Sequence, residues 1–223
     1  MRLLIFGGRT VTDERDIGAV LDATAPDLLI HGACGLDEDD PIDGAKMRGA
    51  DGIAHRLAEA RGIPIDPRPA AWKRLGKPAG MRRNEVMFRL RPTHAAGRIL
   101  GSRGSPMSPG SAGMARICMR GLPGYPPIPL VIYRDDGIDL PGGDALGNAL
   151  ALLRLLFRST PEVAAAGKAT RDALEAEAAG ASPGDVAALT AGARGEVEMV
   201  MREQPRAAPW LAVAVGLLGR ATG

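Results

Sequence analysis

Short apolar segments alternate with helical segments through the first 134 residues, and this alternation most constrains the fold. Three strand-like runs stand out, at residues 3–6, 27–32 and 128–133, and two weaker ones lie at 63–69 and 95–100. Helical patterns follow Thr12, cover 50–62 and 79–92, and lie between 101 and 128. A chain that alternates in this way forms a parallel sheet with helices on both faces. The sequence therefore predicts an α/β protein with a Rossmann-like three-layer fold.

The composition changes near Asn148, where the chain becomes rich in alanine and helical in pattern. We therefore expect two regions, a Rossmann-like ligand-binding domain at 1–138 and a helical C-terminal region at 139–223. The last segment, 208–221, is apolar on nearly every face, but it is shorter than the ~18 residues of a membrane span. We expect it to pack on the first domain or on a partner, and a homodimer is compatible with it.

The net charge of +2 is too close to zero to indicate a nucleic-acid partner by itself. Cys34 and Cys118 are far apart and form no CxxC motif, so small apolar fillers in a reducing compartment are expected. A signal peptide and a membrane-length apolar run are not visible in the sequence. These features predict a cytoplasmic protein without a membrane partner.

The first strand-like run ends in Gly7-Gly8-Arg9, and a helix-start signal at Thr12 follows. Glycines let the backbone approach a ligand, and a helix N-terminus offers N–H donors and partial positive charge to a phosphate. The guanidinium of Arg9 can add a bidentate contact. The alternative is a tight turn with a solvated arginine.

Further candidates follow the later strands. His31 and Gly32 end the second run, and Asp51 can accept hydrogen bonds from ribose hydroxyls or cap its own helix. Trp72 can stack on a base or anchor the core. Another group of candidates, Arg82, Arg83 and Asn84, lies at the start of the helix at 79–92. Cations at a helix N-terminus oppose the helix dipole, so at least one of these arginines is expected to face an anion.

These segments, taken in order, resemble the SLOG superfamily (SMF/DprA–LOG), in particular its YspA-like, YpsA-related branch. The pattern of that branch, GGR…D, HGxAxGAD and W…GKxAGxxRNxxM, is matched over roughly residues 1–90. The resemblance implies a Rossmann-like fold that binds a nucleotide or a nucleotide-derived ligand with a ribose phosphate.

The second glycine loop, "PGSAGM" at 109–114, lies where LOG-type relatives carry PGGxGTxxE before a helix. Gly110 and Gly113 fit this pattern, Ser111 replaces its second glycine, and Ile117 takes the place of the catalytic glutamate. The resemblance assigns the catalytic arginine to Arg83. Hydrolysis of an N-glycosidic bond needs a carboxylate, so Glu85 or an acid of the insert would have to substitute.

That insert, residues 34–47, separates the two halves of the HGxAxGAD pattern and is acidic. It offers oxygen ligands to a divalent metal, or it is a solvated loop; its acids are Asp37, Glu38, Asp39, Asp40 and Asp43. Other metal or cofactor signatures, including a zinc pattern, GxGxxG and a P-loop, are not visible in the sequence. No cofactor is therefore predicted with certainty.

Three functions compete. The first is binding of a nucleotide-derived small molecule by a sensor or effector-linked module. The second is a nucleotide phosphoribohydrolase, and the third is DprA-like binding of single-stranded DNA, suggested by the basic run at 82–98. Few aromatic residues and a near-neutral charge make the nucleic-acid function the weakest of the three.

Overall fold

The computed structural model describes residues 1–101, 105–128, 130–135, 137–139, 145–156, 160–204 and 208–221. The chain divides into two compact units, Met1–Pro141 and Gly142–Gly223. The sequence-based boundary lies between 138 and 139. Each unit is described by itself.

The first unit is built on a sheet in the order β3-β2-β1-β4-β5-β6. Its parallel strands are β1 (Arg2–Gly7), β2 (Leu28–His31), β3 (Ile65–Pro67), β4 (His94–Arg98) and β5 (Leu130–Arg134). β6 (Gly137–Asp139) runs antiparallel to β5 at the edge, and the alternation pattern did not predict it. The predicted α/β class with a parallel sheet is confirmed.

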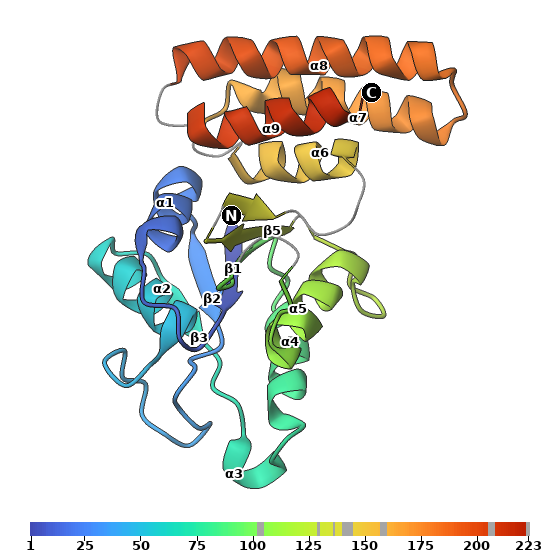
Figure 1. Ribbon diagram of the computed structural model, residues 1–223. Helices are drawn as coiled ribbons and strands as arrows, with labels where there is room; N and C mark the ends of the chain where they lie inside the picture. Colours follow the sequence, from blue (N-terminus) through green and yellow to red (C-terminus); the bar gives the residue numbers. More distant parts are fainter. Residues whose placement is uncertain are drawn as a thin grey trace. The chain divides into compact units, whose positions relative to one another are not determined.

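Helices cover both faces of this sheet (Figure 1). α1 (Arg15–Thr24) packs with α2 (Gly49–Ala60), and α4 (Ala79–Arg89) packs with α5 (Pro109–Arg120). The short α3 (Trp72–Leu75) precedes α4. This is the three-layer arrangement of a Rossmann-like fold.

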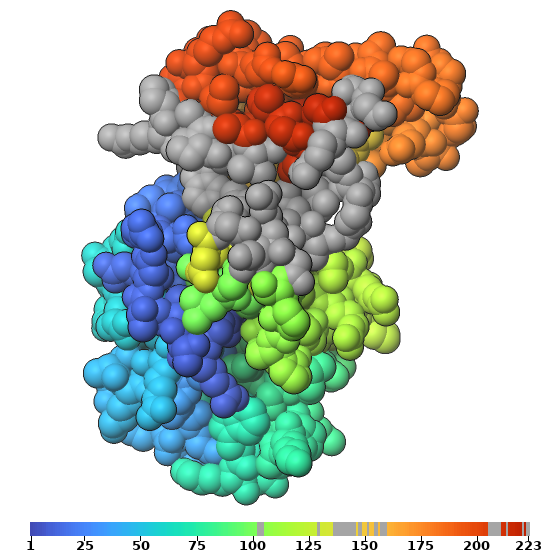
Figure 2. Space-filling view, in the orientation of Figure 1, coloured from blue at the N-terminus to red at the C-terminus, as the bar shows by residue number. Residues whose placement is uncertain are grey.

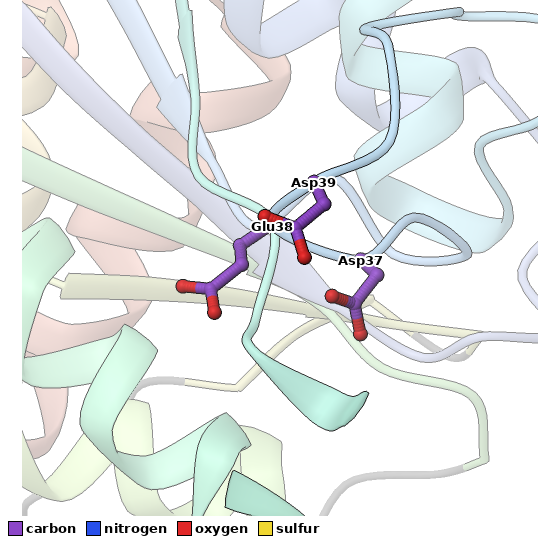
Figure 3. Close-up of side chains that lie close together, drawn as sticks. All are labelled: Asp37, Glu38 and Asp39. Carbon is purple, nitrogen blue, oxygen red and sulfur yellow. The ribbon is translucent and has the colours of Figure 1, made fainter. Parts of the chain in front are cut away.

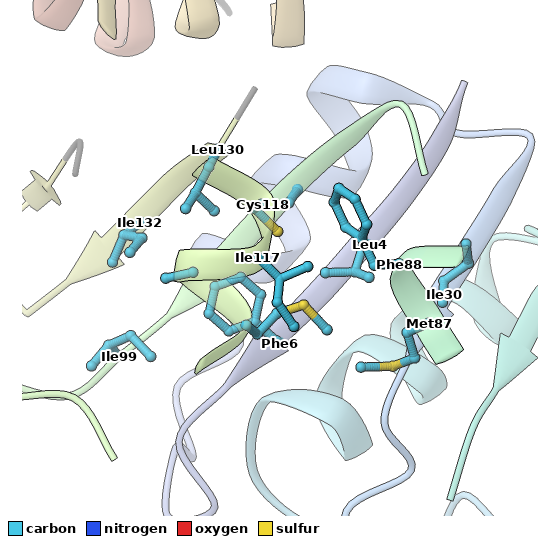
Figure 4. Packing of buried hydrophobic residues seen from close by; sticks show 13 residues of the cluster. Leu4, Phe6, Ile30, Met87, Phe88, Ile99, Ile117, Cys118, Leu130 and Ile132 are labelled. Carbon is cyan, nitrogen blue, oxygen red and sulfur yellow. The ribbon is translucent and has the colours of Figure 1, made fainter. Parts of the chain in front are cut away.

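The side chains of β1 alternate between the two layers. Leu4 and Phe6 join a buried cluster with Phe88 of α4 and Ile117 of α5 (Figure 4). Cys118 lies in the same cluster, and burial raises the pKa of its thiol to about 12. This cysteine is an apolar filler, as its sequence context indicates.

The start of α1 differs from the prediction. Thr12 does not cap the helix, which begins at Arg15 after an N-cap residue, Glu14, that makes no side-chain cap hydrogen bond. Asp13 instead accepts from the backbone N–H and the guanidinium of Arg15. The helix therefore starts two residues later than a cap at Thr12 predicts.

The described residues of the second unit form four helices, α6 (Ala145–Leu156), α7 (Val163–Ala178), α8 (Pro183–Glu203) and α9 (Ala208–Arg220). α6 and α8 each pack against both α7 and α9. Along α8, Val186, Ala193, Val197 and Val200 form a buried stripe at helical spacing. Among the described residues, no helix is both long and apolar enough for a membrane crossing.

Candidate functional site

A cavity of about 940 Å³ opens in the first unit where the parallel strands end. Sheet order places β2 on one side of β1 and β4 on the other, so chain connections diverge at this edge. Five segments line the cavity. The first is residues 6–10, and the second is the loop after β2, which contributes Gly32, residues 34–37 and Asp40. The others are the start of α2 with Arg48 and Asp51, residues between Trp72 and Met87, and the start of α5 from Ser108 to Met114.

Most of the predicted site residues line this one cavity. They are Gly7, Gly8, Arg9, Gly32, Asp51, Arg83, Asn84, Gly110 and Ser111. Four predicted residues are not part of its lining: His31, Arg82, Glu85 and Gly113. The structure therefore brings together segments that are up to about 100 residues apart in sequence.

Gly7, the last residue of β1, serves close packing, and Gly8 follows it. A side chain at Gly7 would overlap the carbonyl of Arg98 and the side chain of Ala50. The N–H of Gly8 donates to the Arg98 carbonyl at 3.0 Å, and its carbonyl accepts from Ala50 at 3.1 Å. Because the Gly8 N–H is already bonded within the protein, it is not the ligand donor that the glycine pattern suggests.

Arg9 follows these glycines and is exposed at the cavity. Its guanidinium carbon lies 5.5 Å from the ring centroid of Trp72, a cation–π contact. Within the described parts of the chain, no carboxylate lies within ion-pair distance of Arg9. In the space-filling view the segment after β1 (dark blue) reaches the surface between the light-blue insert and the teal α3–α4 region (Figure 2). Trp72 is 37% exposed, so it does not anchor the core.

His31 lies behind the cavity wall, fully buried. Its Nδ1 accepts from the N–H of Ala33 at 3.1 Å, so its proton is on Nε2, which donates to Nδ1 of His55 at 3.1 Å. Burial, followed by the charges of His55 and Arg83, lowers the pKa of His31 to about 3. The neutral ring thus holds the turn in which Ala33 has a left-handed φ of 45°.

Asp51 holds the same turn from the side of α2. Its Oδ2 accepts from the N–H of Cys34 at 3.1 Å and lies 3.9 Å from Nη1 of Arg83. Burial raises the pKa of this carboxyl, although Arg83 and the backbone N–H groups of Cys34 and Gly32 oppose the shift. Asp51 does not cap its own helix, because the N-cap of α2 is Arg48 and no side chain caps it.

Arg83 and Asn84 connect three segments of the site. Arg83 donates to the carbonyl of Gly32 and, at 3.1 Å, to Oδ1 of Asn84. Asn84 is buried and donates to the carbonyl of Gly110 at 3.0 Å. A side chain at Gly32 would overlap the guanidinium, so glycine there lets Arg83 enter the site.

The N-terminus of α5 forms another wall of the cavity. Ser108 caps the helix by accepting from the N–H of Ser111 at 3.3 Å, and the Ser111 hydroxyl lies 3.3 Å from the carbonyl of Gly7. The first turn has no acidic residue, so its positive end is not neutralised locally. Gly113 faces the flexible end of the Met81 side chain of α4, which a side chain at this position would displace.

The acidic insert is bound to α3. Asp37 accepts from the backbone N–H of Lys73 at 2.9 Å, and Asp40 accepts from its Nζ at 3.2 Å. Glu38 receives two hydrogen bonds from Arg74, at 2.7 and 2.8 Å. The insert is therefore not simply a solvated loop.

Asp37, Glu38 and Asp39 each have an oxygen within 4.8 Å of the others (Figure 3). Both Glu38 oxygens are engaged by Arg74, however, and neither Glu38 nor Asp39 belongs to the cavity lining. A divalent cation would have to displace Arg74 and compete with the charge of Lys73. These residues fit a metal poorly.

Sequence reasoning did not single out several cavity-lining residues. Arg48 directly precedes the Gly-Ala-Asp sequence, and Lys77 lies in the GKPAG segment, so both stand inside the motifs already quoted. Cys34, which was expected to be a small apolar filler, is only half-buried and also lines the cavity; burial followed by the charge of Asp51 raises the pKa of its thiol.

The chain matches no protein-family model, no curated protein and no solved structure.

Proposed function

We propose that the protein binds a nucleotide or a nucleotide-derived ligand containing a ribose phosphate, as a sensor or effector-linked module. The observation that carries this proposal is that Arg9, Asp51, Arg83 and the Gly110 loop line a single cavity at the carboxyl edge of a parallel sheet. The resemblance of residues 1–90 to the SLOG superfamily supports the same function.

The phosphate would lie at the start of α5. This helix begins with Ser108-Pro109-Gly110, and α8 begins with the same Ser-Pro-Gly sequence at 182–184. In α8 the N-terminus carries Asp185, whereas the first turn of α5 carries no acid. An anion at α5 would find the N–H of Gly110, the positive end of the helix dipole and the guanidinium of Arg83 along the same cavity.

Isothermal titration calorimetry with AMP, ADP-ribose and ribose 5-phosphate tests the proposal. We expect saturable binding of at least one of these compounds, and weaker binding by Arg83→Met. Arg82→Met is the matched control, because Arg82 is exposed and is not part of the cavity lining. No heat of binding at millimolar concentrations of all three would refute the proposal.

A second candidate, N-glycosidic hydrolysis, is favoured by one observation. Glu85 does not line the cavity, but Asp51 does, with a raised pKa and with Arg83 at 3.9 Å. A carboxyl of this kind can take part in proton transfer during hydrolysis. Release of adenine from AMP by the wild type, abolished in Asp51→Asn and retained in Glu85→Gln, would establish this activity.

A further inference from the structure

Asp37 is a carboxylate of the cavity wall that the proposed phosphate contacts do not use. It is 6% exposed and stands in the loop after β2, on the side of β1 away from β4 and α5. Its backbone is fixed, because its N–H donates to Asp40 at 2.8 Å and it forms a parallel bridge with Ala70.

The two oxygens of Asp37 have different surroundings. Oδ2 accepts from the N–H of Lys73, whereas Oδ1 is buried and has no hydrogen-bond partner among the described residues. The neighbouring cations do not compensate it, because Nζ of Lys73 contacts Asp40 and the Arg74 guanidinium contacts Glu38. A buried carboxylate oxygen without a donor is costly, and such groups in folded proteins call for a specific partner.

We propose that Asp37 is a specificity-determining residue that accepts a hydrogen bond from an amino group on the ligand. This inference rests on the proposed function. If the phosphate lies at the start of α5, a nucleotide that spans the end of β1 brings its base toward the insert and α3. The preferred ligand is then a nucleotide whose base carries an exocyclic amino group at its outer edge.

The burial of Oδ1 adds a condition to this contact. Because the oxygen is shielded from solvent, the ligand reaches it only when the side chains that cover it shift, while the backbone of Asp37 stays in place. The amino group then gives its hydrogen bond in a desolvated setting, where a bond to a charged acceptor discriminates strongly between ligands.

The test compares AMP, IMP and ribose 5-phosphate by calorimetry on the full chain. At C6 of the purine, AMP has an amino donor and IMP has a carbonyl acceptor. We expect the wild type to bind AMP about tenfold more tightly than IMP, the effect of one good hydrogen bond to a charged group. Ribose 5-phosphate is expected to bind more weakly than AMP.

Asp37→Asn is the decisive variant. The carboxamide oxygen of the substituted side chain can still accept from Lys73, which places the amide NH₂ where Oδ1 was, so the AMP preference should disappear or reverse toward IMP. Asp43→Asn is the control: Asp43 is an acid of the same insert, but it does not line the cavity, so the AMP-to-IMP ratio should stay at the wild-type value.

The outcomes separate the two proposals. If the wild type binds none of the three compounds, the proposed function fails. If it binds ribose 5-phosphate, but binds AMP and IMP equally, the function stands and the role of Asp37 is refuted, whatever the stability of the variants. An AMP preference that appears only with Mg²⁺ would also refute it, since Asp37 would then be a metal ligand.

Discussion

Arg83 and Arg82 are neighbours in the sequence, yet they have different environments. Arg83 satisfies the carbonyl of buried Gly32 and Oδ1 of buried Asn84, and it is the cation facing Asp51. Arg82 is exposed. One helical step of about 100° separates them, which turns one side chain into the cavity and the other to the surface.

This difference predicts unequal costs of truncation. Arg83→Ala leaves two buried acceptors without a donor and should lower the free energy of unfolding by about 2 kcal/mol. Arg82→Ala should change it by less than about 0.5 kcal/mol. Urea denaturation of both variants measures the difference, and equal stabilities would mean that Arg83 makes no structural contribution.

His31 gives the protein a pH dependence of defined sign. Its pKa is about 3 in the folded chain, below the ordinary 6.5, so between these values the unfolded chain binds a proton that the folded chain does not. Its contribution to stability is therefore complete above pH 6.5 and is lost as pH falls toward 3, by up to about 1.4 kcal/mol per pH unit.

His31→Asn tests this contribution, because the amide oxygen can still accept from Ala33. We expect the free energy of unfolding to fall less steeply in the variant than in the wild type between pH 6 and pH 4, as measured by urea titrations. Other titrating groups are common to both proteins. Parallel pH profiles would contradict the assignment of a neutral, buried His31.

At the scale of elements, the N-termini of α5 and α8 can be compared, because both helices begin with Ser-Pro-Gly. Ser108 caps α5 and Ser182 caps α8, each by accepting from a backbone N–H three residues later. Removing either cap by substitution with alanine should cost about 1 kcal/mol. Only Ser108→Ala should also weaken binding of ribose 5-phosphate, by about two- to fivefold, since the α5 N-terminus lines the cavity.

Denaturation and calorimetry on both variants provide the readouts. A loss of binding in Ser182→Ala equal to that in Ser108→Ala would show that the α5 N-terminus has no special part in recognition.

The elements of the first unit were largely predictable, whereas their contacts were not. Strand runs and helix signals depend on nearby residues, so the five parallel strands and the helices at 50–62 and 79–92 are found close to their expected positions. The pairing of the insert with α3 joins residues more than 30 positions apart, and local patterns contain no information about it. Short β6 lacked a sequence signal strong enough to distinguish it from a turn.

At the scale of the whole molecule, every residue assigned to the site belongs to the unit Met1–Pro141. Ligand binding should therefore slow amide hydrogen exchange at the cavity segments, 7–10, 32–37, 48–51, 72–84 and 108–114. We expect no change in α7 and α8. Exchange followed by mass spectrometry at saturating AMP measures this, and protection spread equally over α7 and α8 would show that the helical unit takes part in binding.

The sequence by itself determined the alternation of strands and helices, the parallel sheet and the edge at which most of the predicted site residues gather, because these follow from local apolar spacing and chain direction. The tertiary structure decided which side chains reach the cavity. Gly7 accommodates the neighbouring backbone of Arg98, and His31 supports a turn. Glu85 lies outside the cavity lining, whereas Asp37 has an unpartnered oxygen at the cavity wall. These outcomes depend on helical phase and on packing between distant segments, which only the folded chain specifies.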